Sequence, residues 1–177
     1  MRRARYRVGQ FFRHLRRVPL TPAEQSEAAA ALASPALAAL FAQHSPSEQA
    51  HALRVLRAVR AGSHPYTAQP ELLQAALLHD IGKVCAPLNV FERTLAVLGR
   101  RLLPGLAARW GQSAPRGLYK AFAVAAQHPA WGVDLCAQTG APPLTLALIR
   151  RHQTPVAHPA TLEDEMLLVL QVADDDS

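Results

Sequence analysis

The chain has 177 residues, of which 50% are hydrophobic and 18% charged, so it can bury one core and wholesale disorder is excluded. Aromatic residues make up only 6%, while Ala and Leu are abundant, which favours packed helices over a sheet. The net charge is +6, and no apolar run reaches the roughly 18 residues of a membrane-spanning helix. The two cysteines, Cys85 and Cys136, lack CxxC spacing and are typical of reduced thiols in a cytoplasmic protein.

A basic segment opens the chain. It combines arginines with apolar residues at helical spacing, namely Val8, Phe11, Phe12, Leu15 and Val18. The pattern predicts a basic amphipathic helix over residues 1–20, followed by the main domain over residues 21–177. Such a helix can make weak contact with nucleic acid or an anionic membrane, but a solvated helix face with a frayed end is the favoured interpretation. No apolar run of signal-peptide length follows the arginines.

Capping signals predict the first helices of the main domain. Residues 21–24 (TPAE) and 45–48 (SPSE) each match a capping box with Pro at the first helical position. The second of these helices should run to about Ala61 and stop at Gly62. Pro70 then opens a helix that carries His79 and Asp80 before Gly82 weakens it.

The second half of the chain continues the helical pattern. Leu residues at 95, 98 and 102 indicate a helix that Pro104-Gly105 breaks, and a shorter helix follows through Trp110. A helix from Pro115 should end at His128-Pro129, because the residue before a proline is pushed out of the α region. Three more helices are expected over residues 130–139, with Gly140 as the cap, 143–152, and from Thr161 towards residue 174. We therefore expect an all-α bundle of about eight to ten helices and no strand.

The segment from Leu77 to Lys83 (LLHDIGK) contains the most informative pair of residues, His79 and Asp80. An apolar run precedes them, which places the Asp80 carboxylate in or near the core. Burying an unpaired carboxylate costs several kcal/mol, so a nearby cation, hydrogen-bond donor or metal ion is expected.

With these residues the chain resembles the HD superfamily of metal-dependent phosphohydrolases, in particular its subset with an HDIGK-like motif. The superfamily places a His on the helix before the HD pair and an Asp, often after Ala, on a late helix. Members with two metals add two histidines in between. The resemblance covers residues 48–175 and implies a single HD-type helical bundle. It also implies six metal ligands, which are His51, His79, Asp80, His128, His152 and Asp174.

In the family arrangement, His51, His79 and Asp174 hold the first ion, and His128 and His152 hold the second. Asp80 bridges the two ions. Four imidazoles and two carboxylates suit one or two divalent transition metals (Fe, Mn, Zn, Ni or Co) and not calcium. The implied activity is cleavage of a phosphoester or phosphoanhydride bond by a metal-activated hydroxide, in a nucleotide or other phosphorylated small molecule. Asp80 and Lys83 are the expected catalytic residues, since Lys83 would stabilise charge developing on the phosphate.

Other interpretations remain open. Each histidine can instead be a core or capping residue, Asp175 and Asp176 compete with Asp174, and Lys83 can be a charged helix end. The chain lacks the Gly-Tyr-Pro signature of the cyclic-di-GMP branch, and a non-catalytic HD domain that senses a ligand or binds a protein is the alternative function. His44 has no place in the pattern and is expected in a loop.

A helical insertion is expected at about residues 86–120. It carries five arginines, which are Arg93, Arg100, Arg101, Arg109 and Arg116. They could contact substrate phosphates, but the solvent-exposed face of a lid helix is the slightly favoured interpretation. The substrate, the metal and the oligomeric state stay open.

Overall fold

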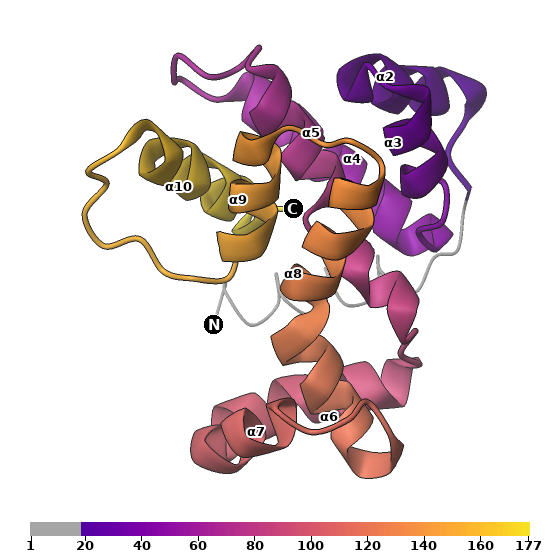
Figure 1. Ribbon diagram of the computed structural model, residues 1–177, viewed down its shortest axis with the longest axis vertical. Helices are drawn as coiled ribbons and strands as arrows, with labels where there is room; N and C mark the ends of the chain where they lie inside the picture. Colours follow the sequence, from indigo (N-terminus) through magenta and orange to yellow (C-terminus); the bar gives the residue numbers. More distant parts are fainter. Residues whose placement is uncertain (1–18) are drawn as a thin grey trace, which may run out of the picture.

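The structure, a computed structural model, describes residues 19–177, and this part of the chain is all helical, as expected (Figure 1). The amphipathic helix expected at the N-terminus lies outside the described residues, apart from Pro19 and Leu20. From residue 19 onwards there are nine α-helices, two short 3₁₀ helices and no strand. In chain order they are α2 (Pro22–Leu32), α3 (Pro35–Phe41), α4 (Pro46–Ala61), α5 (Pro70–Leu78), η1 (Ile81–Cys85), α6 (Val90–Leu102), α7 (Pro104–Gly111), η2 (Gly117–Tyr119), α8 (Lys120–Gln138), α9 (Pro143–Arg151) and α10 (Leu162–Asp175).

Both expected capping boxes are present. The Thr21 and Ser45 hydroxyls accept hydrogen bonds from the backbone N–H three residues on, and the following glutamates accept from the cap backbone. A third box, Asn89 with Glu92, was not expected and starts α6 at Val90, ahead of the leucines that indicated the helix. Helix α2 ends at Ala33, which has φ 52°, and Ser34 then caps the start of α3. The single helix expected after Thr21 is therefore two helices.

The expectation that a helix ends at His128-Pro129 was wrong. Helix α8 begins at Lys120, not at Pro115, and continues through Pro129 to Gln138. A proline inside a helix removes one hydrogen bond and tends to kink it. Here the helix is buried on both sides of the proline, at Val124 and Val133 among others, so packing outweighs the lost bond.

The helices form a bundle with an arm at one end. Helices α4, α5, α9 and α10 pack around a common core, while α8 runs from this bundle down to α6 and α7 (Figure 1). The core is largely aliphatic, and its largest fully buried residues include Leu53, Leu56, Leu72, Leu77, Ile81, Leu148, Ile149 and Leu167. We call residues 86–119, which contain α6, α7 and η2, the arm. No helix of the described part has the length and apolar character to cross a membrane.

Candidate metal centre

The six residues expected to bind metal come together in the structure as two groups of three. Within each group, the ligand atoms all lie within 4.8 Å of one another. The first triad is His51, His79 and Asp174, and the second triad is Asp80, His128 and His152. Three of the six lie in α4, α8 and α10, and the other three directly follow α5 and α9, so the site lies where the bundle helices converge.

The first triad is organised around one carboxylate oxygen. Asp174 Oδ1 lies 2.9 Å from His51 Nε2 and 3.5 Å from His79 Nε2. The side chain of His79 is almost fully buried, whereas that of Asp174 keeps 37% of its surface exposed. A ligand from outside can therefore reach this triad from the Asp174 side. Of the three acids that end α10, only Asp174 belongs to the triad.

The second triad is built in the same way around Asp80. Its Oδ1 atom lies 3.1 Å from His128 Nε2 and 3.9 Å from His152 Nε2. The two histidines point their Nε2 atoms at each other across 3.2 Å. All three residues of this triad are buried.

Asp80 also faces the first triad. Its second oxygen, Oδ2, lies 3.6 Å from His79 Nε2, and the His79 and His152 rings are 5.3 Å apart. The two oxygens of one carboxylate are thus directed at the two groups of ligands. This is possible because α5 ends at Leu78: His79 caps it and Asp80, at φ −99°, already belongs to the turn into η1.

Three of the four histidines are oriented by their own helices. The Nδ1 atoms of His79, His128 and His152 contact the backbone carbonyls of Ala76, Val124 and Ile149 at 3.1, 2.8 and 2.8 Å. A carbonyl oxygen only accepts, so each Nδ1 carries the proton. In a neutral ring Nε2 then presents a bare lone pair to the site, which is the arrangement of a metal-binding histidine.

The charges of the site are strongly coupled. Burial favours the protonated form of Asp80, but Lys83, His79 and His128 hold its pKa well below the usual value. Burial opposes ionisation of Asp174 as well, yet the neighbouring imidazoles of His51 and His79 keep its pKa low. His79 has a raised pKa although burial lowers it, because the two carboxylates stabilise its charged form. Burial and the neighbouring His79 lower the pKa of His152 to about 3.

These features fit a metal ion. The two groups consist of imidazole and carboxylate side chains, which are common metal ligands in proteins. His79 Nε2 is buried without a hydrogen-bond partner within the described residues, and the Nε2 atoms of His128 and His152 face each other across 3.2 Å beside the Asp80 carboxylate. A cation placed between these nitrogen atoms would coordinate them. Without a partner, a polar atom buried in a close-packed interior costs free energy.

Lys83 lies beside the two triads, in contact with Asp80. It belongs to η1, its ammonium donates to Asp80 Oδ2, and its side chain is partly exposed. Gly82 lets η1 approach α8 closely, since a β-carbon there would overlap the His128 carbonyl oxygen and lie 2.7 Å from the Gly132 nitrogen. This glycine therefore allows Asp80 to meet His128.

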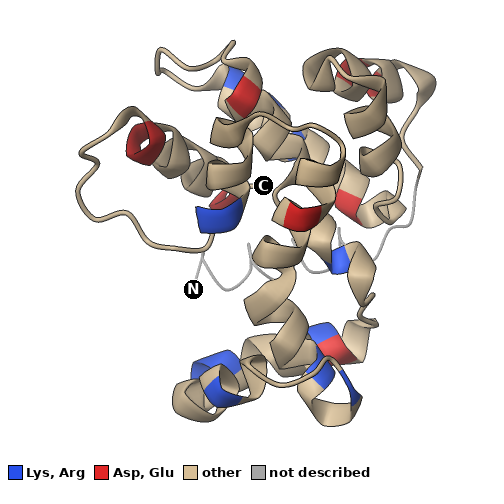
Figure 2. Ribbon diagram, viewed as in Figure 1, with Lys and Arg blue, Asp and Glu red and all other residues tan. Residues whose placement is uncertain are grey.

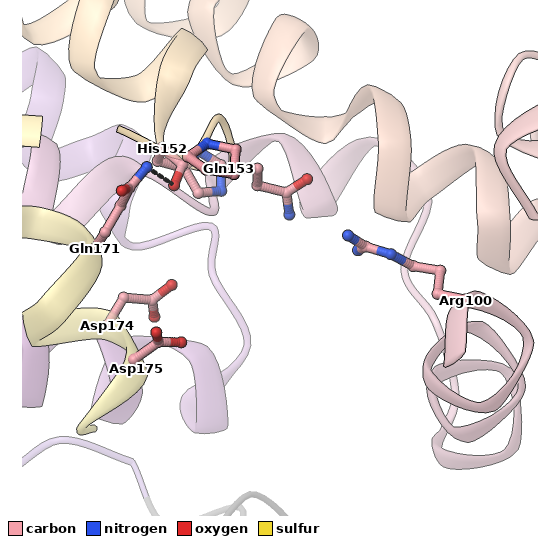
Figure 3. Close-up of a pocket in the computed structure, with 7 residues that line it drawn as sticks. Arg100, His152, Gln153, Gln171, Asp174 and Asp175 are labelled. Atoms are coloured by element: carbon pink, nitrogen blue, oxygen red, sulfur yellow. Dashed lines mark hydrogen bonds between the residues drawn. The ribbon is translucent and has the colours of Figure 1, made fainter. Parts of the chain in front are cut away.

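Two openings reach the centre. A pocket of about 340 Å³ is lined by His152 and Asp174, with Gln153, Gln171 and Arg100 around it (Figure 3). A larger groove of about 1270 Å³ is lined by His51, Lys83 and Asp174 among others. Helix α6 lines it with Arg93 and Thr94 and with four apolar residues, Val90, Phe91, Val97 and Leu98. It is large enough for a nucleotide-sized ligand.

The sequence interpretation missed two glutamines at the centre. Gln153 brings its amide to 3.5 Å from His128 Nε2. Gln171 donates to the carbonyls of His152 and Thr154 and so holds the end of α9 against α10. A signal for Gln171 was available, since it precedes Asp174 by one helical turn and must share its face. His44 does lie in a loop, as expected, but it is buried there.

Comparisons with protein-family models, with curated proteins and with solved structures found no match for this chain.

Proposed function

We propose that the chain is a metal-dependent phosphohydrolase of the HD type, which cleaves a phosphoester or phosphoanhydride bond in a nucleotide-type substrate. The observation that carries this proposal is the pair of triads with Asp80 directed at both. A lone His-Asp pair occurs for structural reasons in many proteins. Four histidines and two aspartates that converge from distant parts of the chain, three of the histidines being oriented by backbone carbonyls, have no comparable structural role.

The residues present divide the work as follows. The first and second triads would each hold one divalent ion, and Asp80 would contact both. Ions bound there would supply Lewis-acid activation of water and of the phosphoryl group. Lys83 would direct its ammonium at a phosphate oxygen and stabilise the negative charge that develops during cleavage. Asp174, which is half-exposed, marks the side from which the phosphate enters.

The groove supports a substrate with an apolar or aromatic body. His51, Lys83 and Asp174 line the groove, and a phosphate would bind beside them, while α6 adds the apolar side chains of Val90, Phe91, Val97 and Leu98. A nucleobase or a similar ring would cover the exposed side chains of Phe91 and Val97, of which 74% and 67% are accessible. Burial of such apolar surface favours binding by roughly 25 cal/mol per Å².

The test is turnover by the full chain reconstituted with Mn²⁺ or Fe²⁺. A chromogenic phosphodiester and a panel of nucleoside mono-, di- and triphosphates serve as substrates, and Asp80→Asn is the inactive control. We expect metal-dependent cleavage that Asp80→Asn abolishes. A protein that binds metal but cleaves none of these compounds contradicts the enzymatic function and favours the non-catalytic ligand sensor.

A further inference from the structure

The arm brings basic residues close to the proposed metal centre. Lys and Arg residues are visible on α6 and α7 (Figure 2). The arginines of the arm do not have equivalent positions. Arg93 is already paired, since it donates to Glu48 at 2.7 Å and to the Leu88 carbonyl at 3.2 Å. Among the five, Arg100 is the one that lines the 340 Å³ pocket.

Arg100 faces the centre from the opposite side of that pocket. Figure 3 shows its guanidinium group directed inward from α6, with Asp174 and Asp175 across the pocket and His152 and Gln153 nearby. Each triad contributes one ligand to this pocket, namely Asp174 and His152. A ligand that touches both triads on this side therefore lies within the pocket that Arg100 lines.

The guanidinium group of Arg100 is available for a ligand. Within residues 19–177 it makes no hydrogen bond or ion pair, and its side chain is exposed. Two divalent ions in the triads would carry more positive charge than Asp80 and Asp174 neutralise. Arg100 would then face a net positive centre, which is unfavourable unless an anion lies between them. A phosphate has the geometry to do so, because guanidinium binds it through two parallel N–H groups.

Packing of the arm fixes where Arg100 emerges. The preceding residue, Gly99, lies against the ring of Phe122 on α8, and a β-carbon there would come within 2.6 Å of the ring carbon Cζ. Phe122 is itself buried and packs against Trp110, with ring centroids 5.0 Å apart. Helix α6 thus approaches α8 closely at the residue before Arg100, which sets the side of the pocket that Arg100 occupies.

We propose that Arg100 binds a phosphate group of the substrate, so that the arm supplies the cation that selects anionic ligands at the centre. This inference rests on the proposed function, because it needs ions in the two triads. Gln153, whose side chain lies between His152 and Arg100 in Figure 3, would add a neutral hydrogen-bond donor to the same phosphate. Arg101, the next residue along α6, is also exposed but lines neither opening, and it is the matched control.

The test is calorimetric titration of the Mn²⁺-treated full chain with inorganic phosphate. We expect Arg100→Ala to raise the phosphate Kd by about tenfold or more, the usual effect of losing a charged hydrogen bond. Arg101→Ala should stay within about twofold of the wild type, and Arg100→Lys should lie in between because it keeps the charge and loses the paired geometry. Thermal unfolding confirms that the variants are folded.

Two results would overturn the inference: a wild-type protein that binds no phosphate, or an Arg100→Ala variant that binds it as tightly as Arg101→Ala does. Turnover of the chromogenic phosphodiester is measured in parallel and separates the two proposals. If the wild type turns over and Arg100→Ala binds phosphate as tightly as Arg101→Ala, the hydrolase proposal stands and the role of Arg100 is rejected. If Arg100→Ala alone loses phosphate binding and the wild type shows no turnover, the anion site stands and the hydrolase proposal is rejected.

Discussion

His128 Nε2 and Asp80 Oδ1 lie 3.1 Å apart, and this contact depends on a close approach of η1 to α8. Gly82 and Gly132 lie at the point of approach, where the backbones of the two elements meet without intervening side chains. The HDIG segment therefore does two things. His79 and Asp80 provide ligands, and the glycine two residues later allows the second triad to assemble.

Gly82→Ala should destabilise the protein severely. The new β-carbon would overlap the backbone of α8, which cannot move aside as a flexible side chain could, so we expect a loss of about 3 kcal/mol or more. Gly105→Ala on α7 is the matched control, because nothing lies within 4 Å of its β-carbon, and it should be neutral or slightly stabilising. Urea unfolding of both variants measures the difference; equal stabilities would show that η1 and α8 do not pack as described.

Lys83→Ala should slow catalysis while leaving the metal content unchanged. Lys83 contacts Asp80 but is not a member of either triad, so its proposed role is to stabilise charge on the phosphate. Removing one such group typically lowers kcat by about 100-fold. Lys120, which is bound to the Pro87 carbonyl in the arm, is the control, and Lys120→Ala should stay within a few-fold of wild type. A Lys83→Ala variant with wild-type kcat would restrict Lys83 to a structural role.

Much of the fold could be predicted because its start signals are local. Thr21 and Ser45 start their helices through capping contacts within four residues, and both capping boxes are present in the structure. Pro129 shows where local rules fail. Its effect on the preceding residue favours a helix end, but burial of α8 on both sides of it decides the outcome, and burial depends on residues far away in the chain.

The six residues of the candidate site and their division into two groups were both expected from the resemblance, and the structure brings together the same two groups. The sequence could not predict the surroundings of the site, because these depend on how the helices converge. The arginines illustrate the same limit. Arg93 and Arg100 lie on one helix and look alike in sequence, yet one is paired with Glu48 and the other faces the pocket. Tertiary packing therefore decides which arginine forms an ion pair with a carboxylate.

His44 should make the metal-free protein less stable as pH falls. Burial lowers its pKa to about 4 from 6.5, and Glu48, 4.0 Å away, offsets only part of that effect. Between these pH values the unfolded chain binds a proton at His44 that the folded chain does not. The contribution of His44 to the free energy of unfolding is therefore fully present above pH 6.5 and is lost as the pH falls towards 4. For His44→Leu, the loss of stability between pH 7 and pH 4.5 should be smaller than that of the wild type by about 2 kcal/mol.

The matched control for this experiment is His158→Leu, since His158 is exposed. Urea unfolding in the presence of a chelator, at pH 7 and pH 4.5, gives the two losses for each protein. We expect the His158→Leu variant to follow the wild type. If His44→Leu loses as much stability as the wild type, then His44 is not a buried neutral histidine in the folded protein.

The most direct test of the metal centre is the number of ions that the full chain retains after reconstitution with Mn²⁺ and removal of the excess, measured by elemental analysis. We expect about two ions per chain for the wild type and for the control His158→Ala. His51→Ala removes a ligand of the first triad and His152→Ala a ligand of the second, so each variant should retain about one. A wild type that retains no metal, or triad variants that retain as much as His158→Ala, would contradict the assignment of these six residues to a metal centre.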